Sequence, residues 1–236
     1  MTSKEFDGRV AIVTGASSGI GRATAEMLVE RGALVAVFAR SAGKLRTFAR
    51  KHEGRMLAVP GDVSDSESIE RLFGQTESKL GPCDILVNNA GTYVNKRVEK
   101  MTERDWDRVF AVNVRGAFLT TRRAARSMIS RRKGTIVNVS SISGVPGPEK
   151  FPGYSAYCAS KAALIEFTEV VAVELKEHGI RVNCISPGSV DTPMWAAVSG
   201  GARADMTPAE IAEVILFLAS ERSRPINGQN IDVYSA

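Results

Sequence analysis

The chain has 236 residues, 44% of them hydrophobic and 24% charged, with a formal net charge of +5, which is ordinary for a soluble globular protein. A chain of this length can bury a sizeable hydrophobic core without needing disulfides to stabilise it. No apolar run approaches the roughly 20 residues that cross a bilayer. The opening segment, MTSKEFDGR, contains no apolar stretch typical of a secretory signal. We therefore expect a protein that does not use a membrane.

The cysteines and the charges exclude two further classes. Cys83, Cys158 and Cys184 are far apart, and with only two histidines no zinc-ligand spacing occurs. We expect reduced thiols, a cytoplasmic protein and no metal site. The densest basic cluster, between residues 122 and 133, belongs to the outer face and C-terminal end of one predicted helix, where cations suit the helix dipole. No aromatic residues alternate with it, so we expect no nucleic-acid partner.

Strands and helices alternate along the chain. The predicted strands are 10–14, 34–39, 56–60, 85–88, 135–139, 181–185 and 230–233. The predicted helices are 22–32, 42–52, 66–80, 102–130 with an interruption, 157–177 and 208–219. The central strands are continuously apolar, which is typical of a parallel sheet covered on both faces. We expect one α/β domain over 1–236, with a doubly wound parallel sheet of about seven strands and helices on both faces.

A glycine-rich turn, TGASSGIG, joins the first strand to the first helix. Gly15, Gly19 and Gly21 allow a tight turn and a close approach of backbone to phosphate, and the following helix directs free N–H groups at the anion. The spacing differs from the commoner Gly-x-Gly-x-x-Gly, but its context fits. The same letters also match the Gly-x-Ser-x-Gly elbow of hydrolases, with Ser17 as nucleophile. That alternative requires a catalytic histidine, but His52 lies on a predicted polar helix and His178 lies at the C-terminal end of another, just before Gly179, where a cation commonly caps.

Polar or turn-forming residues follow four of the predicted strands, at 62–63, 88–91, 140–141 and 187–188. The carboxyl ends of parallel strands meet at one edge of the sheet, where open α/β sheets bind ligands. The two longest irregular stretches, 140–153 and 187–206, also follow strands. We expect both stretches to lie at that edge and to carry function.

Tyr157 and Lys161 stand four residues apart on a predicted helix, so their side chains share one face. An ammonium beside a phenol favours the phenolate, and a nearby opposite charge lowers a pKa by roughly 1–3 units. The phenol, with an ordinary pKa of about 10, then approaches neutrality, where a general acid or base works best. A half-buried tyrosine beside a solvated lysine is the alternative interpretation of this spacing.

Several motifs together resemble the short-chain dehydrogenase/reductase family. They are TGASSGIG, Asp62-Val63, NNAG at 88–91, Asn113 in VNV, Ser141, Tyr157-x-x-x-Lys161 and the segment from Pro187 to Thr192. Their order and spacing cover nearly the whole chain, and they look most like bacterial reductases of the 3-oxoacyl-carrier-protein reductase type. The resemblance implies a Rossmann fold and hydride transfer between a nicotinamide cofactor and a small carbonyl compound or secondary alcohol.

The resemblance also implies a role for each motif residue. Tyr157 is the expected general acid or base, Lys161 lowers its pKa and binds the nicotinamide ribose, and Ser141 holds the substrate oxygen. Asn113 anchors a water relay to Lys161. The expected cofactor-binding residues are Gly15, Ser17, Ser18, Gly19, Ile20, Gly21, Arg40, Ser41, Asp62, Val63, Asn89, Ala90, Gly91, Tyr157, Lys161, Pro187, Gly188, Val190 and Thr192. The expected substrate-binding residues are Ser141, Tyr93, Tyr154 and Trp195, and Cys158 is expected to be a small core residue.

The end of the second predicted strand favours NADP(H) over NAD(H). An acidic residue at this place selects NAD by bonding the ribose 2′-hydroxyl, whereas this chain has Ala39, Arg40 and Ser41. An arginine offers a 2′-phosphate a planar, bidentate partner. Two alternatives remain: an NAD(H)-dependent dehydrogenase of the same family, and a dinucleotide-binding regulator without catalysis.

Two features depart from the family pattern. The substrate loop, about 189–206, is short, which predicts an open substrate pocket. The C-terminal segment, 229–236, lacks the Asp-Gly-Gly that usually follows the last strand. The subunit contacts that the family makes through this segment are therefore not expected to be the usual ones. The resemblance nevertheless implies a homo-oligomer, most simply a tetramer formed by pairing of two long helices across a two-fold axis.

Overall fold

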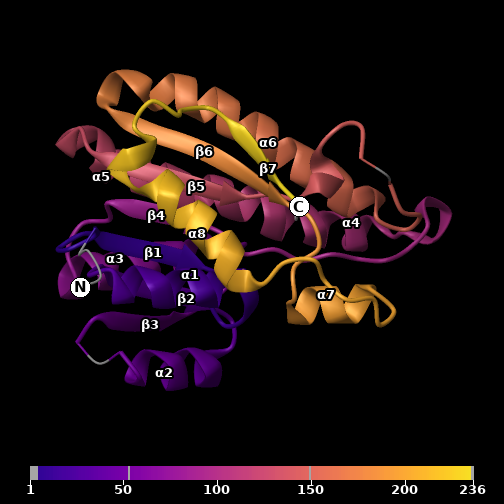
Figure 1. The fold of residues 1–236 in the computed structure, drawn as a ribbon, viewed down its shortest axis with the longest axis horizontal. Coiled ribbons are helices and arrows are strands. Elements are labelled where there is room, and N and C mark those ends of the chain that lie inside the picture. Colours follow the sequence, from indigo (N-terminus) through magenta and orange to yellow (C-terminus); the bar gives the residue numbers. More distant parts are fainter. Residues whose placement is uncertain (1–4, 53, 149, 235–236) are drawn as a thin grey trace.

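The structure is a computed structural model that describes residues 5–52, 54–148 and 150–234. Within these residues, seven parallel strands form one sheet in the order β3-β2-β1-β4-β5-β6-β7 (Figure 1). Their bounds are β1 Val10–Thr14, β2 Leu34–Ala39, β3 Met56–Pro60, β4 Ile85–Asn88, β5 Gly134–Val139, β6 Ile180–Pro187 and β7 Asn230–Val233. The predicted doubly wound parallel sheet is confirmed, and residues 235–236 at the atypical ending lie outside the described part.

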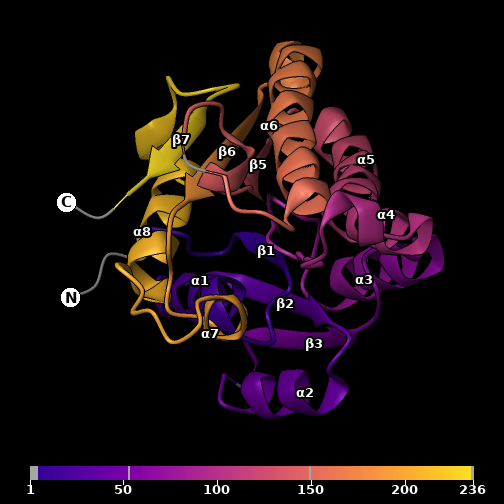
Figure 2. The ribbon, with the colours of Figure 1, turned by 90° about the vertical axis from the view of Figure 1, so that its right-hand side faces the viewer.

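Helices cover both faces of the sheet, as Figure 2 shows in a view along the strands. α1 (Gly19–Glu30) and α8 (Pro208–Ala219) pack together on one face, where α2 (Ala42–Arg50) also contributes. The other face carries α3 (Ser66–Lys79), α4 (Glu103–Phe110), α5 (Gly116–Arg131) and α6 (Ser155–Leu175). In the part of the chain described, no helix is both long enough and apolar enough to span a bilayer.

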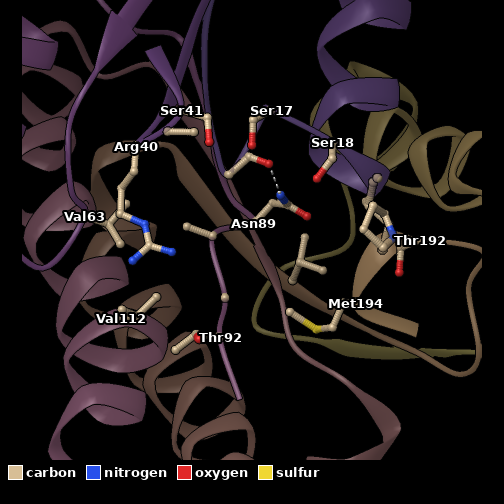
Figure 3. Close-up of a pocket in the computed structure, with 18 of the residues that line it drawn as sticks. Ser17, Ser18, Arg40, Ser41, Val63, Asn89, Thr92, Val112, Thr192 and Met194 are labelled. Atoms are coloured by element: carbon tan, nitrogen blue, oxygen red, sulfur yellow. Dashed lines mark hydrogen bonds between the residues drawn. The ribbon is translucent and has the colours of Figure 1, made fainter. Parts of the chain in front are cut away.

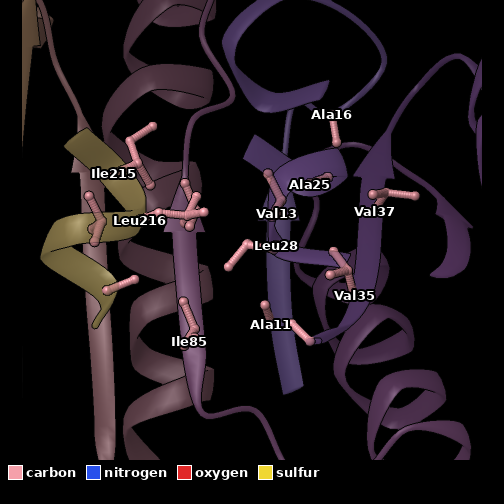
Figure 4. Packing of buried hydrophobic residues seen from close by; sticks show 14 of the residues in the cluster. Ala11, Val13, Ala16, Ala25, Leu28, Val35, Val37, Ile85, Ile215 and Leu216 are labelled. Atoms are coloured by element: carbon pink, nitrogen blue, oxygen red, sulfur yellow. The ribbon is translucent and has the colours of Figure 1, made fainter. Parts of the chain in front are cut away.

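The strands divide the core into two layers because successive side chains point to opposite faces. On β1, Ala11 and Val13 pack toward α1 and α8, whereas Ile12 packs toward α3, α5 and α6. Figure 4 shows the first layer, in which Leu28 of α1 and Leu216 of α8 flank the same strands. This alternation, with both faces buried, explains the continuous apolar runs in the sequence.

Two helical details lie next to the site. The predicted interruption within 102–130 is a π-helical turn, Ala111–Arg115, between α4 and α5. Such turns are rare in proteins, but where they occur they often lie at functional sites. The stretch 187–206 was expected to be irregular, but it contains the short helix α7 (Pro193–Val198). Thr192 caps α7 by accepting from the Trp195 N–H, and Pro193 suits the first helical position because its missing N–H is not needed there.

Candidate active site

Two adjoining cavities open at the carboxyl edge of the sheet. The first has a volume of about 280 Å³ and is shown in Figure 3. The second is larger, at about 840 Å³. The residues that line both are Ile20, Ser140, Tyr157, Thr192 and Met194. The predicted proton donor, Tyr157, therefore stands where the two cavities meet.

The glycine turn forms one wall of the first cavity. Gly15 has a φ of +68°, and a Cβ there would lie 2.8 Å from both Ala90 Cα and Asn89 Nδ2. Gly21 does not line the cavity, but its Cβ would lie 2.3 Å from Asn89 Nδ2. Glycine thus lets the turn pack directly on the end of β4. The wall that results, bare backbone at a helix N-terminus, suits a cofactor pyrophosphate.

Thr14 and Asn89 hold that packing in place. Asn89 Nδ2 donates to the Thr14 carbonyl at 2.9 Å and to the Gly15 carbonyl at 3.4 Å. Thr14 Oγ1 accepts from the Asn89 and Ala90 N–H groups, each at 3.1 Å. Thr14 is not among the residues predicted from the sequence, although it is the first residue of TGASSGIG.

Most of the predicted cofactor residues line the first cavity. They are Gly15, Ser17, Ser18, Gly19, Ile20, Arg40, Ser41, Asp62, Val63, Asn89, Ala90, Gly91, Tyr157, Lys161 and Thr192. Sequence reasoning missed Gly61, Thr92, Val112 and Pro193, which lie there as well. Pro187, Gly188 and Val190 line the second cavity and not the first.

Arg40 directs its guanidinium into the first cavity, on the side of Val63 and Val112 (Figure 3). Arg40 is exposed, and its side chain makes no hydrogen bond or ion pair with any residue that the structure describes. Asp62, also in the wall, uses Oδ1 to accept from the Ser64 N–H at 2.9 Å and from its hydroxyl at 2.7 Å. The arginine is therefore free to bind an anion, whereas the aspartate stabilises its own turn.

Tyr157 and Lys161 project from the first two turns of α6. The Lys161 ammonium is buried, donates to the Val139 carbonyl at 2.8 Å, and lies 5.7 Å from the centre of the Tyr157 ring. Burial lowers the pKa of Lys161 to about 8. Desolvation raises the pKa of Tyr157, and the Ser141 hydroxyl acts against that rise. The structure thus differs from the expectation that Lys161 lowers the Tyr157 pKa, because desolvation of the phenol dominates.

The two consecutive serines after β5 have different surroundings. Ser140 is buried, and its hydroxyl donates to the Lys161 carbonyl at 2.8 Å. Ser141 is half-buried, lines the second cavity, and its hydroxyl accepts from the Ser143 N–H at 3.2 Å. Ser140 also lines this cavity, but its hydroxyl is bonded to the backbone, whereas the Ser141 hydroxyl lies next to Tyr157; the choice of Ser141 as the substrate-binding serine stays a prediction.

Asn113 lies in the π-helical turn and is fully buried. Its Oδ1 accepts from the Thr92 N–H at 2.8 Å, and its Nδ2 donates to the Thr92 carbonyl and to Ser160 Oγ, each at 2.9 Å. Ser160 Oγ in turn donates to the Tyr157 carbonyl at 2.8 Å. Asn113 and Ser160 therefore connect the loop after β4 with the first turn of α6. Sequence reasoning missed Ser160, since serine at a helix start has many ordinary uses.

The second cavity has an aromatic wall. The rings of Tyr93 and Tyr154 stack with centroids 6.2 Å apart, and the Tyr154 hydroxyl accepts from Asn95 Nδ2 at 3.2 Å. Trp195 lines the same cavity. All four predicted substrate residues therefore border one space. Cys158 is a correction: it is half-buried and lines this cavity, so it is not a core residue.

The hydrolase alternative gains no support. Neither cavity has a histidine among its lining residues in the described part of the chain. His52 instead lies 3.6 Å from Glu26 and packs edge-on against Phe48. Ser17 therefore has no imidazole base within reach. The described residues also contain no group of three His, Cys, Asp or Glu side chains arranged to hold a metal ion.

A parallel sheet with a glycine turn and strand ends around one edge cavity defines a dinucleotide-binding α/β protein of the Rossmann type. Residues 9–202 match the family model described as short chain dehydrogenase. The chain belongs to the short-chain dehydrogenase family, whose members are oxidoreductases that use NAD or NADP.

Named relatives resemble the chain over its whole length. It is 38% identical to the 3-oxoacyl-[acyl-carrier-protein] reductase of Thermotoga maritima, with 97% of each chain covered. It is 35% identical to the NAD-dependent glycerol dehydrogenase of Listeria innocua, over 98% of this chain and 96% of that protein. A solved short-chain type dehydrogenase/reductase from Mycobacterium marinum superposes with a TM-score of 0.89 at 34% identity, covering 98% and 95%.

Proposed function

We propose that this protein is an NADP(H)-dependent oxidoreductase that transfers a hydride between nicotinamide and a carbonyl compound or secondary alcohol. The observation that carries the proposal is the position of Tyr157 at the junction of the two cavities, with Lys161 in the first and Ser141 in the second. The first cavity would hold the cofactor and the second the substrate. Residues 1–236 would act as one domain, with 189–206 as the substrate loop.

In this proposal the protein orients the reactants and moves the proton. The cofactor supplies or accepts the hydride when it is bound. The Ser141 hydroxyl donates a hydrogen bond to the substrate oxygen, and the Tyr157 hydroxyl gives that oxygen its proton as the carbonyl is reduced. Burial raises the pKa of the Tyr157 phenol above its ordinary value, so the phenol holds a proton that it can donate. Lys161 lies beside the phenol and would bind the nicotinamide ribose, and Asn113 would support a proton path to Lys161.

The test is turnover of NADPH and NADH with a panel of aryl and alkyl ketones, and of NADP⁺ and NAD⁺ with the matching alcohols. We expect NADPH consumption with at least one ketone. A protein that binds either dinucleotide but turns over none of the panel would instead be a dinucleotide-binding regulator. Ester cleavage without cofactor would support the Ser17 hydrolase.

We propose NADP(H) as the cofactor on the basis of Arg40. Its guanidinium faces the first cavity without a partner among the described residues, and no carboxylate follows β2 to repel a 2′-phosphate. A hydrogen bond to a charged group contributes roughly 1.5–3 kcal/mol, which is about 10–150-fold in affinity. Arg40→Ala should lower kcat/KM for NADPH by that factor and leave NADH nearly unchanged.

NAD(H) is the second candidate, and the name of the Listeria innocua relative, an NAD-dependent glycerol dehydrogenase, favours it. The same measurement decides between the two. Equal losses for both cofactors in Arg40→Ala, or a parent that prefers NADH, would remove the assignment to NADP(H).

We further propose a cytoplasmic homo-oligomer, in the form of a tetramer. Phe118 on α5 and Val170 and Val173 on α6 are large apolar side chains that lie 42%, 49% and 74% exposed on neighbouring helices. Pairing of these helices across a two-fold axis would cover them. Light scattering at micromolar concentration should give the mass of four chains, and the mass of a single chain would overturn the tetramer.

A further inference from the structure

The second cavity carries positive charge that its own walls do not neutralise. Lys150 and Arg203 line it from two different loops, and neither forms an ion pair with a carboxylate in the described part of the chain. Asp205 is the one acidic side chain among the described lining residues. Its carboxylate accepts a hydrogen bond from the Ser189 hydroxyl at 2.5 Å. The described residues that line the cavity therefore carry a net positive charge, although most of the wall that they form is apolar.

Lys150 is held close to the proposed reaction centre. Its ammonium donates to the carbonyls of Ile142, Ser143 and Val145, at 3.3, 3.0 and 2.6 Å. These carbonyls belong to the turn that directly follows Ser141. They satisfy the ammonium's donors but do not cancel its charge. The positive charge of Lys150 acts on Cys158, which lines the same cavity. Burial raises the pKa of the Cys158 thiol, and the charge of Lys150 opposes that rise.

Arg203 lies on the segment between α7 and α8 and has no hydrogen bond with a described residue. Its planar guanidinium presents donors in the geometry that a carboxylate accepts through both oxygens. Arg203 is exposed to solvent, so the strength of such a pair depends on this two-oxygen geometry and is reduced by salt. Trp195, Val198 and Met206 provide apolar surface in the same cavity.

We propose that the substrate is a carbonyl compound with a large apolar or aromatic body and a carboxylate. The carboxylate pairs with Arg203 in the field of Lys150, the body packs on the aromatic wall, and the carbonyl lies at Ser141 and Tyr157. A cavity of about 840 Å³ is within the range that holds drug-sized ligands and far exceeds a simple ketone. This inference rests on the proposed function, since it names the substrate class of the same site.

The first experiment compares 4-oxo-4-phenylbutanoate with its methyl ester, using NADPH as reductant. The two probes share the aryl ketone and differ in the negative charge. The parent should have the higher kcat/KM for the acid, and Arg203→Gln should lower the acid-to-ester ratio of kcat/KM about tenfold. The matched control is Arg224→Gln, an exposed arginine outside both cavities, which should leave the ratio at the parental value.

Salt provides a test that requires no substitution. Raising the ionic strength from about 0.01 to 0.5 M shortens the Debye length from about 30 Å to a few ångströms. The KM for the acid should rise with salt and the KM for the ester should not. A parent that reduces the ester at least as efficiently as the acid, with equal salt dependence, overturns the carboxylate assignment and leaves the proposed function intact.

A binding measurement separates this inference from the proposed function. Calorimetry in the presence of NADP⁺ compares 4-phenylbutanoate with 4-phenylbutanamide, and neither compound needs to react. The parent should bind the carboxylate more tightly, and Arg203→Gln should reduce the difference by the same factor of about ten. Equal affinities overturn the inference. Selective carboxylate binding without turnover of any ketone overturns the proposed function only.

A phosphate monoester presents similar anionic oxygens, so 2-phenylethyl phosphate is included as a third ligand. We expect it to bind no more tightly than 4-phenylbutanoate, because the Arg203 guanidinium can form the same two parallel hydrogen bonds with either anion. Tenfold tighter binding of the phosphate would show that the cavity recognises a phosphorylated compound and would overturn the carboxylate assignment.

Discussion

The two cavities share one edge of the sheet and differ in how they are built. The first is formed by strand ends and backbone, and hydrogen bonds from Thr14 and Asn89 fix its glycine wall. The second is formed mainly by the stretches 140–158 and 187–206, with side chains as its surface. The first cavity is therefore specified by the fold, whereas the second can change with its loops without disturbing the sheet.

This difference suggests that the first cavity accepts a cofactor common to many enzymes, whereas the second cavity selects a particular substrate. A backbone wall accepts the constant part of a cofactor, since main-chain N–H groups are present whatever the side chains are. A side-chain wall recognises the particular shape and charge of a substrate. Tyr157 lines both cavities, so a substitution near it should change the rate of the reaction. A substitution deeper in one cavity should change the affinity for the ligand of that cavity alone.

Tyr157→Phe gives the largest expected effect, because it removes only the hydroxyl at the junction. General acid catalysis contributes about 10²–10⁴-fold, so kcat should fall by that factor while the cofactor still binds. The measurement is steady-state turnover together with cofactor titration by fluorescence. Tyr154→Phe is the matched control and should be much milder. A Tyr157→Phe enzyme with more than about a tenth of parental kcat would show that another group donates the proton.

Gly21→Ala should damage the first cavity without touching the second. The added Cβ would meet Asn89 Nδ2 at 2.3 Å and the Gly15 carbonyl oxygen at 2.8 Å, so Asn89 must move. Overpacking costs about 1–3 kcal/mol, which corresponds to a loss in cofactor affinity of roughly 5–150-fold.

Gly74→Ala on α3 is the control for that substitution, because a Cβ there has no heavy atom within 4 Å. It should raise the free energy of unfolding by about 0.5–1 kcal/mol and leave cofactor affinity unchanged. Parental cofactor affinity in Gly21→Ala would show that the contact between the turn and Asn89 does not shape the first cavity.

Lys161→Met should abolish turnover and yet stabilise the protein free of ligands. The buried ammonium has a pKa of about 8 in the folded chain, against an ordinary value of 10.5, so folding disfavours its charge. After allowance for the lost hydrogen bond to Val139, the gain in the free energy of unfolding at pH 7 should be about 2 kcal/mol. Urea unfolding at several pH values measures it.

The pH dependence of that gain has a definite sign. Below pH 8 Lys161 is protonated in both the folded and the unfolded parent, so the full free-energy cost of burying its charge is present. Between about pH 8 and 10.5 the unfolded chain holds more protons than the folded one, and the parent's stability rises with pH. The advantage of Lys161→Met should shrink over that window. An advantage that grows with pH, or none at pH 7, would contradict the assignment of a disfavoured buried cation.

Ser160→Ala should have the smallest of these effects and should act on geometry. Ser160 joins Asn113 to the Tyr157 carbonyl, and a lost hydrogen bond of this kind costs about 0.5–1.5 kcal/mol. We expect kcat to fall about three- to tenfold with KM nearly unchanged, and Ser160→Thr to restore part of it. A change in KM alone would assign Ser160 to substrate binding and remove its positioning role.

Much of the first cavity could be predicted from the sequence. Glycines, strand ends and a helix start are local signals, and parallel strands bring them to one edge without further information. The absence of a carboxylate after the second strand was also a local signal, and it pointed to Arg40, whose guanidinium faces the cavity. Thr14 was missed because the partners of its hydroxyl, Val87, Asn89 and Ala90, lie 73 to 76 residues further along the chain.

The second cavity was predicted less completely, since its walls depend on how loops fold back. Tyr93, Tyr154 and Trp195 were identified, but Lys150, Arg203 and Cys158 were not assigned to the cavity. Cys158 follows Tyr157 directly, and only the orientation of the first turn of α6 decides whether its thiol meets the core or the cavity. The direction of the Tyr157 pKa depends on desolvation, and no spacing in the sequence reveals desolvation.

The π-helical turn at Ala111–Arg115 has a consequence for how the chain tolerates change in length. A wider turn uses more residues than the 3.6 of an α-helix, so α4 and α5 are separated by what amounts to a short insertion within one long helix. Deleting one residue there would let the segment close into regular α-helix, with α4 and α5 nearly in their present orientation and the side chains within the turn itself redirected. Asn113 would leave its bonds with Thr92 and Ser160. Length variants at this turn should therefore keep the helix and lose the connection between the loop after β4 and α6.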